Sequence, residues 1–355
     1  MKRKYLLLLT PVSILFLLLA KNIPFLAEYI FARGTFKIAS IPVGFLSSLV
    51  PFSIAELLLY SLPVIFLVLL IRFIYLMLHP GRIAVLKRWG TNLGITLSIM
   101  LFLFTILCGT NYYRYEFENF CDFKTSEYSV SQLYELCVYL AEQSNSAKEE
   151  ITQTNPVPFS TVSKDAKKAF KKIQKQYPVL RYSTGRAKPV LASHLMSYTG
   201  IVGIYIPFTV EANVNTDIAD YNHPFDTCHE LAHLHGFMRE NEANFIAYLA
   251  CIQSDDAYFR YSGYMTALIY ATNALYDEDT KLYMQISALL SDEVHADLHE
   301  EDIYWEKIRT TKAYQTVETA SDKVNDTYLK INGQSDGVKS YGKIVDLLLA
   351  EYFAR

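Results

Sequence analysis

The sequence predicts a mainly helical protein in which three membrane-spanning helices precede a helical α+β domain with a small sheet. Two observations carry this prediction. Apolar residues crowd the first 110 positions, whereas later positions show the apolar spacing of helices around one short strand-like segment. The 355 residues suffice for an anchor and one sizeable domain. We therefore expect a membrane anchor over residues 1–110 and a separate domain over residues 111–355.

Three apolar runs approach the roughly 20 residues that a helix needs to cross the hydrocarbon core. They cover about residues 5–20, 54–78 and 91–110. The first run follows the basic start Lys2-Arg3-Lys4, so a cleaved signal peptide is the alternative interpretation. No obvious small-residue cleavage site follows Ala20, which favours an uncleaved helix and leaves cleavage open.

Basic residues predict how these helices are oriented. Lysine and arginine gather at the chain start and between the second and third runs: Lys2, Arg3, Lys4, Arg82, Lys87 and Arg88. The positive-inside rule places both groups on the cytoplasmic face. The third span then leads outward, although Arg33 and Lys37 in the first outer loop weaken the bias. We expect a multi-pass protein of the cytoplasmic membrane with an extracytoplasmic C-terminal domain.

Composition excludes two classes of function. The net charge of −3 does not suggest a nucleic-acid partner. The lipid bilayer is the expected non-protein partner, because of the three apolar runs. Six lysines between Lys164 and Lys175 have the spacing of a solvated helix face, and a patch that binds lipid or nucleic acid is the alternative. The five cysteines form no CxxC pair, which excludes a thiolate zinc ribbon. Whether Cys121 and Cys137 pair is not decided by the sequence.

Secondary structure in the second part is predicted from local pattern. A β-branched and aromatic stretch at 201–206 predicts a strand, and residues 208–214 a second extended piece. Helices are expected from about Phe225 to a C-cap at Gly236, and from Arg239 to Ile252. Further helical periodicity covers about residues 256–276, 279–291 and 295–326.

The run His229-Glu230-Leu231-Ala232-His233 is an HExxH motif on a predicted helix. Residues four apart on a helix lie on the same face, so both imidazoles can reach one Zn²⁺. Glu230 points beside the metal, where it can accept a proton from the attacking water and pass it to the leaving amine. The motif therefore predicts a zinc-dependent hydrolase with Glu230 as its catalytic base.

A catalytic zinc site has three protein ligands and one open position. Position 239 is arginine, which excludes the zinc peptidases that carry a third histidine there. Glu240 is the favoured third ligand and Glu242 the alternative, because Gly236 lets the next helix return to the motif. Asn244, one turn after Glu240, is positioned to hydrogen-bond a ligand histidine.

HELAH followed by an E-x-E-A-N run resembles the gluzincins, whose metal site is HExxH plus a downstream glutamate. In the related membrane peptidases the first glutamate of E-x-x-A-[DN] is the ligand, which corresponds to Glu240 here. Asn244 stands where those enzymes usually have aspartate, and the spacing from HExxH is much shorter in this chain. The resemblance implies a zincin-like domain.

Over nearly its whole length the chain also resembles a bacterial family catalogued as domain of unknown function 3810. The shared features are the N-terminal apolar spans and segments like Gly203–Phe208, His229–His233, Glu240–Phe245, Tyr261–Tyr264 and Tyr328–Lys330. This resemblance implies a bacterial zinc peptidase and brings no known substrate.

The gluzincin likeness implies two further features. The stretch Gly203–Phe208 is expected to be an edge strand that pairs with an extended substrate. A tyrosine or arginine is expected to stabilise the oxyanion, with Arg260, Tyr261, Tyr328 and Tyr341 as candidates.

The sequence thus favours a membrane-anchored zinc metallopeptidase acting on a protein or peptide outside the cytoplasmic membrane. The alternative is a metal-binding membrane sensor or scaffold protein without catalytic turnover. Metal content alone does not separate the two, whereas a Glu230→Gln variant does.

Overall fold

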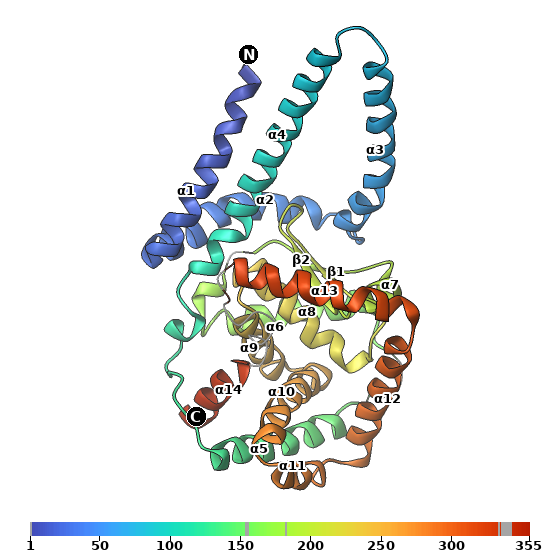
Figure 1. Cartoon of the computed structure of the whole chain (residues 1–355). Helices are drawn as coiled ribbons and strands as arrows, with labels where there is room; N and C mark the ends of the chain where they lie inside the picture. The colour runs from blue at the N-terminus through green and yellow to red at the C-terminus, as the bar shows by residue number, and fades with distance from the viewer. Residues whose placement is uncertain (1, 153–155, 182, 333, 335–342) are drawn as a thin grey trace. The chain divides into compact units, whose positions relative to one another are not determined.

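The computed structural model describes residues 2–152, 156–181, 183–332, 334 and 343–355 (Figure 1). The predicted mainly helical class is confirmed, with three long apolar helices towards the N-terminus and one small sheet. The chain divides into two compact units. The first unit is Met1–Tyr115 with Ile206–Glu211, and the second is Glu116–Tyr205 with Ala212–Arg355.

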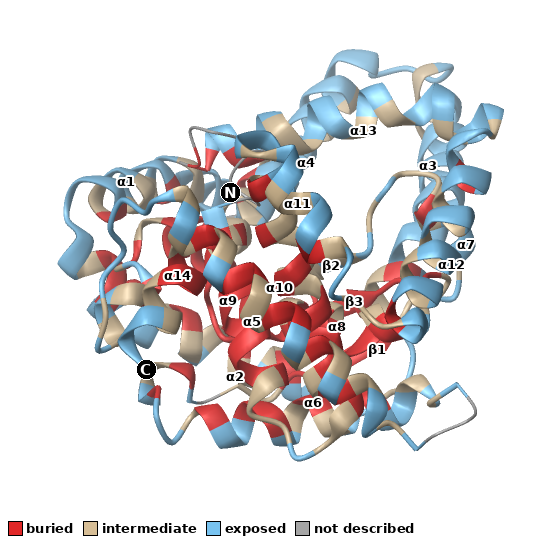
Figure 2. Ribbon diagram, turned by 90° about the horizontal axis from the view of Figure 1, so that it is seen from below, coloured by how far each residue is buried: buried red, intermediate tan, exposed pale blue. Residues whose placement is uncertain are grey.

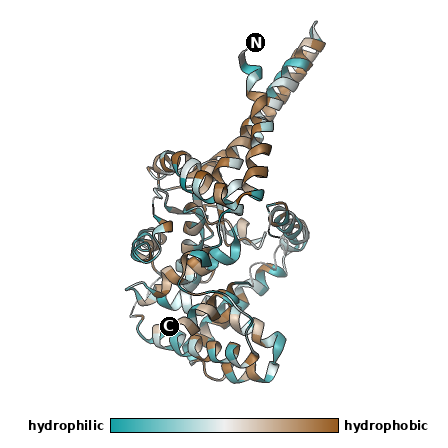
Figure 3. Cartoon of the chain, turned by 90° about the vertical axis from the view of Figure 1, so that its left-hand side faces the viewer, coloured by the Kyte–Doolittle hydropathy of each residue, from teal (hydrophilic) through white to brown (hydrophobic). Residues whose placement is uncertain are grey.

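The first unit contains the candidate membrane helices. Its elements are η1 (Lys2–Leu8), α1 (Leu9–Asn22), η2 (Leu26–Thr35), α2 (Phe36–Ser47), α3 (Ile54–Met77), α4 (Arg82–Leu107) and η3 (Gly109–Tyr113). Three helical stretches are long and apolar enough to cross a membrane: Arg3–Asn22, Ile54–Met77 and Arg82–Leu107. Apolar residues dominate these stretches (Figure 3). They indicate a multi-pass membrane protein.

The helix that contains the third apolar run begins before that run. The helix α4 begins at Arg82 and not near residue 91, and its N-cap Gly81 has a φ of 96°. The first turns of α4 therefore carry Arg82, Lys87 and Arg88, which lie between the second and third apolar runs of the sequence. A hydropathy pattern marks where a helix becomes apolar, whereas the helix itself begins at the backbone turn.

The second unit is built around buried helices. Its α-helices are α5 (Val130–Glu149), α6 (Phe159–Ile173), α7 (Ser193–Ser197), α8 (His223–Leu234), α9 (Glu240–Ile252), α10 (Ala257–Glu278), α11 (Thr280–Ser287), α12 (Asp292–Arg309), α13 (Lys312–Ile331) and α14 (Ile344–Ala354). Short 3-10 helices are η4 (Phe117–Phe120), η5 (Pro178–Leu180) and η6 (Asp220–Asn222). Buried residues concentrate on α5, α8, α9 and α10 (Figure 2).

One helix expected over residues 295–326 is two in the structure. The helix α12 ends at Arg309, and Thr311 caps α13 by accepting a hydrogen bond from the Tyr314 backbone N–H. A threonine hydroxyl can satisfy a free N–H at a helix start, so this position begins a new helix.

The small sheet has the order β1-β3-β2, with β1 (Ala187–Pro189), β2 (Gly203–Ile206) and β3 (Glu211–Val214). The strands β1 and β3 are parallel, with Ala187 opposite Ala212. The expected strand at 201–206 is confirmed as β2, and the second extended piece as β3. The sequence pattern did not predict β1. This order leaves β2 at one edge of the sheet.

The turn after α8 reverses the chain towards α9. The Gly236 N–H donates to the His233 carbonyl, the Phe237 N–H donates to the Ala232 carbonyl, and Gly236 has a φ of 89°. These are the bonds of a helix C-terminus closed by a left-handed glycine, as expected for Gly236. The next helix begins at Glu240.

Candidate metal centre

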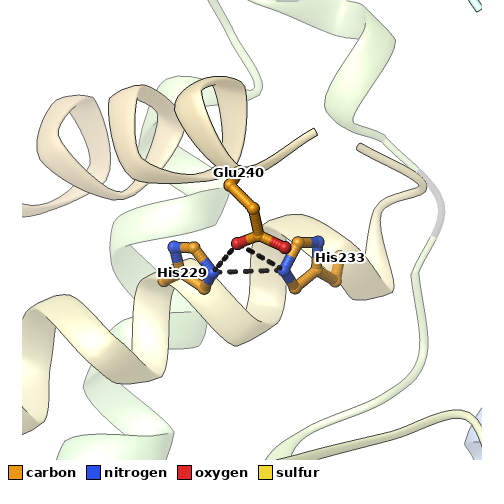
Figure 4. A group of neighbouring side chains, drawn as sticks. All are labelled: His229, His233 and Glu240. Carbon is orange, nitrogen blue, oxygen red and sulfur yellow. Dashed lines mark hydrogen bonds and ion pairs between the residues drawn. The ribbon is translucent and has the colours of Figure 1, made fainter. Parts of the chain in front are cut away.

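The histidines of the motif lie on one face of α8 with their Nε2 atoms 3.1 Å apart. The first residue of α9, Glu240, directs its carboxylate at both rings (Figure 4). Its Oε2 atom lies 3.2 Å from His229 Nε2 and 3.8 Å from His233 Nε2. These three side chains form a group that could hold a metal ion.

The spacing of the three donor atoms fits a small tetrahedral ion. Bonds of about 2.0–2.1 Å to zinc place neighbouring tetrahedral ligands about 3.3 Å apart. The observed separations between the three donor atoms, 3.1, 3.2 and 3.8 Å, lie on either side of that value. Two imidazole nitrogens and one carboxylate oxygen are a zinc donor set that leaves one position open.

Each histidine ring is oriented through its other nitrogen. His229 Nδ1 lies 2.6 Å from Asn244 Oδ1, and His233 Nδ1 donates to the Phe237 carbonyl at 2.7 Å. Asn244 Nδ2 in turn donates to the Tyr270 hydroxyl at 3.2 Å. Such contacts select the tautomer that leaves Nε2 available to a metal. The glycine turn after α8 supplies the Phe237 carbonyl, which links the backbone geometry directly to the site.

Glu230 interacts electrostatically with His229 and Glu240 and is not one of the three members of the donor group. Its side chain is buried, and Oε2 has no hydrogen-bond partner among the described residues. Gly203 of β2 leaves the room that this carboxylate occupies, because a Cβ at that position would lie 2.3 Å from Glu230 Oε1. A buried carboxylate oxygen without a donor costs free energy, and such groups occur at functional sites.

Glu242, the alternative third ligand, points elsewhere. Its Oε1 accepts hydrogen bonds from Arg239 Nη1 at 2.6 Å and from the Phe117 backbone N–H at 2.9 Å. Two residues along a helix correspond to about 200° of rotation, so Glu240 and Glu242 face opposite ways. The structure therefore brings Glu240, and not Glu242, to the histidines.

Burial and charge shift the pKa values within the site. Burial lowers the pKa of His229, but the hydrogen bond and negative charge of Glu240 outweigh it and raise that pKa to about 9. Burial dominates at His233 and lowers its pKa to about 4. Burial raises the pKa of Glu230 to about 8 and that of Asp226 to about 7. A cluster of displaced pKa values is typical of functional sites.

The oxyanion candidates make other contacts. Arg260 pairs with Glu150, and the Tyr261 hydroxyl donates to Asp297. Tyr261 also lines a cavity of about 410 Å³, and His229, His233 and Glu240 do not line it. Tyr328 lies on α13 and is 38% exposed. Tyr341 lies outside the described residues.

Four neighbours of the site lie outside the HExxH motif and the Glu240 run: Gly203, Tyr205, Asp226 and Tyr270. Gly203 and Tyr205 belong to the stretch that was expected to pair with a substrate. The Tyr205 ring centroid lies 6.3 Å from that of His233. Asp226 precedes Glu230 by four residues, so helical spacing could have found it. Tyr270 comes from α10 and had no sequence signal. The possible Cys121–Cys137 pair is not formed, since both residues have free thiols.

Comparison with known families gives one match. The family described as "Protein of unknown function (DUF3810)" matches residues 31–349. The chain belongs to this family. The DUF3810 match includes α3, α4 and all three members of the His229, His233 and Glu240 group. No curated protein and no solved structure matches the chain.

Proposed function

We propose that this DUF3810 protein is a membrane-anchored zinc metallopeptidase of the gluzincin type, in which His229, His233 and Glu240 hold zinc and Glu230 is the catalytic base. The observation that carries the proposal is the Glu230 carboxylate. It is buried, interacts electrostatically with His229 and Glu240, and has one oxygen that no described residue hydrogen-bonds. A purely structural metal site would have no need for such a group.

The chemistry divides between the metal and the chain. When bound, zinc lowers the pKa of a water molecule and polarises the carbonyl of the scissile peptide. Glu230 accepts the proton of the attacking water and delivers it to the leaving amine. Asn244 and the Phe237 carbonyl keep both imidazoles in the orientation that binding requires.

An extended substrate would lie along β2. This strand is at the edge of the sheet, and its first residue, Gly203, lies against Glu230. An edge strand offers unpaired backbone groups to a peptide, which favours a protein or peptide substrate. Tyr205, on the same strand near His233, is placed to contact that substrate.

We further propose that residues 1–110 anchor the protein in a bacterial cytoplasmic membrane and that residues 111–355 form an extracytoplasmic zincin-like domain. The basic residues at the start of η1 and in the first turns of α4 support this orientation. Fusing alkaline phosphatase or green fluorescent protein after Arg355 tests it. High phosphatase activity with a dark fluorescent fusion is expected, and the reverse pattern would contradict the orientation.

The activity is tested on the detergent-purified full chain with a mixture of quenched fluorescent peptides and with β-casein. The wild type should contain about one zinc per chain and cleave at least one probe, and chelation should abolish cleavage. Glu230→Gln should retain zinc and lose about 10³-fold in rate, since general acid–base catalysis contributes 10²–10⁴-fold. Its matched control is Glu242→Gln, which changes a buried carboxylate on the next helix.

Two outcomes would refute parts of the proposal. Stoichiometric zinc without cleavage of any probe by the wild type would favour the metal-binding sensor or scaffold instead. Absence of zinc after incubation with zinc would refute both interpretations of the site.

A further inference from the structure

A second site lies within the first unit, at the basic ends of η1 and α4. A pocket of about 580 Å³ is lined by Arg3, Lys4, Lys87, Arg88, Thr91 and Asn92, with Ile95 deeper along α4. Four cationic side chains and two polar ones thus surround one space. The proposed peptidase chemistry uses none of these residues.

Packing explains why a pocket opens here. Leu7 of η1 packs close to α4 at Gly94, where a Cβ would lie 3.2 Å from Leu7 Cδ2. Further along, the Thr10 and Ser98 hydroxyls are hydrogen-bonded at 2.7 Å. One turn before Gly94, a Cβ at Gly90 would meet no atom within 4 Å. The helices are therefore in close contact along their apolar parts and separate towards their basic ends.

The positive charge of the pocket is not balanced by the described residues around it. No acidic side chain is among the described residues that line it. Residues 1–110 contain just two acidic residues, Glu28 and Glu56. Glu28 is bound by Arg33 and Arg114, and Glu56 accepts a hydrogen bond from the Tyr60 hydroxyl at the other end of α3. Like charges repel, so an anion that lies between these four exposed cations is stabilised.

The surroundings point to a lipid as the source of that anion. The pocket lies at the ends of two candidate spans, Arg3–Asn22 and Arg82–Leu107. Trp89 lies in the turn of α4 that carries Lys87 and Arg88, and it packs edge-on against Phe73 with the ring centroids 5.1 Å apart. Tryptophan is enriched in membrane proteins at the depth of the lipid headgroups. Below the pocket, Leu93 and Leu97 of α4 are 61% and 57% exposed, which provides an apolar surface for acyl chains.

We propose that this pocket binds the phosphate headgroup of an anionic phospholipid. The guanidinium groups of Arg3 and Arg88 and the ammonium groups of Lys4 and Lys87 neutralise and hydrogen-bond the phosphate. Basic pockets between membrane helices bind such headgroups. The acyl chains lie along the exposed leucines of α4. This binding is independent of zinc and of peptide hydrolysis.

The test measures the binding of phosphatidylglycerol, phosphatidylcholine and inorganic phosphate to the full-length protein by native mass spectrometry from detergent. The test variant is Lys87→Gln/Arg88→Gln. The matched control, Arg72→Gln/Arg82→Gln, removes the same charge from α3 and α4 but changes no residue that lines the pocket.

The wild type should retain phosphatidylglycerol and not phosphatidylcholine. The test variant should bind phosphatidylglycerol about 30-fold more weakly, and the control less than about threefold. An equal loss in both variants would show generic attraction to surface charge and overturn the site. Displacement of the lipid by millimolar inorganic phosphate would show that free phosphate suffices, which would overturn the lipid assignment. Equal retention of phosphatidylcholine would also overturn it.

Discussion

Gly203 of β2 and Glu230 of α8 are so close that a single methyl group at position 203 would overlap the Glu230 carboxylate. The built Cβ would lie 2.3 Å from Glu230 Oε1 and 2.8 Å from Glu230 Cδ. The end of a side chain can rotate away more easily than a backbone can move. The overlap would therefore be relieved mainly by displacing the carboxylate from its place near the candidate metal-binding group.

Gly203→Ala should accordingly keep zinc and lose peptidase activity. A displacement of about 1 Å at a catalytic group costs on the order of 10²-fold in rate. The measurement is kcat on the best quenched peptide, together with zinc content. Val202→Ala is the matched control, because it shortens the neighbouring side chain and keeps the Val202 carbonyl that accepts from Asn215 N–H. Unchanged kcat in Gly203→Ala would mean that the Glu230 position is not set by β2.

Glu240→Gln and Glu242→Gln should separate metal binding from folding. Glu240→Gln should weaken zinc affinity by at least about 10-fold, because an amide oxygen replaces an anionic ligand. Glu242→Gln should retain zinc but lower the free energy of unfolding by about 1–3 kcal/mol, since it removes the charge that pairs with the partly exposed Arg239. Zinc titration and urea unfolding measure the two effects. Loss of zinc affinity in Glu242→Gln, with unchanged affinity in Glu240→Gln, would make Glu242 the ligand.

Asn244→Ala should weaken zinc binding about 10–100-fold, because His229 would lose the partner that holds its ring. Tyr270→Phe removes the hydroxyl that accepts from Asn244 and leaves Asn244 in place. This control should change zinc affinity less than about threefold, because it removes only one hydrogen bond to Asn244 and leaves the contact of Asn244 with His229. Competition with a chelator measures the zinc affinities of both variants and of the wild type. Equal affinities in Asn244→Ala and wild type would refute the orienting role of Asn244.

Zinc affinity should rise with pH up to about 9. In the metal-free protein the pKa of His229 is raised to about 9, so this imidazole carries a proton at pH 7 that zinc must displace. Each unit of pH between about 7 and 9 should therefore strengthen binding about 10-fold, and Glu230, with a pKa of about 8, should add to the trend as it ionises.

His233, whose pKa is lowered to about 4, is already neutral and should contribute nothing in this range. Competition with a zinc-selective dye across pH 6–10 measures the slope. A plateau beginning near pH 6.5, the range of an ordinary histidine, would contradict the raised pKa of His229.

Much of the fold and part of the site could be predicted from local sequence pattern. Membrane spans can be predicted from apolar runs, and helical periodicity places His229 and His233 on one face of a helix. Each of these features depends on a short stretch of sequence. The left-handed turn at Gly236 is likewise a local property of glycine. The start of α4 at Arg82 and the break between α12 and α13 were missed, because helix boundaries depend on caps and turns more than on apolar spacing.

Sequence alone thus determined the three apolar runs. It also gave the hypothesis that His229 and His233 bind zinc, and it narrowed the third ligand to Glu240 or Glu242. Tertiary structure decided which glutamate reaches the histidines, because Arg239 and the Phe117 backbone hold Glu242 on the opposite side of α9. It also decided that Gly203 and Tyr270 adjoin the site, and that basic residues more than 80 positions apart share one pocket. Such contacts join residues distant in sequence, and only the packing of whole helices and strands brings them together.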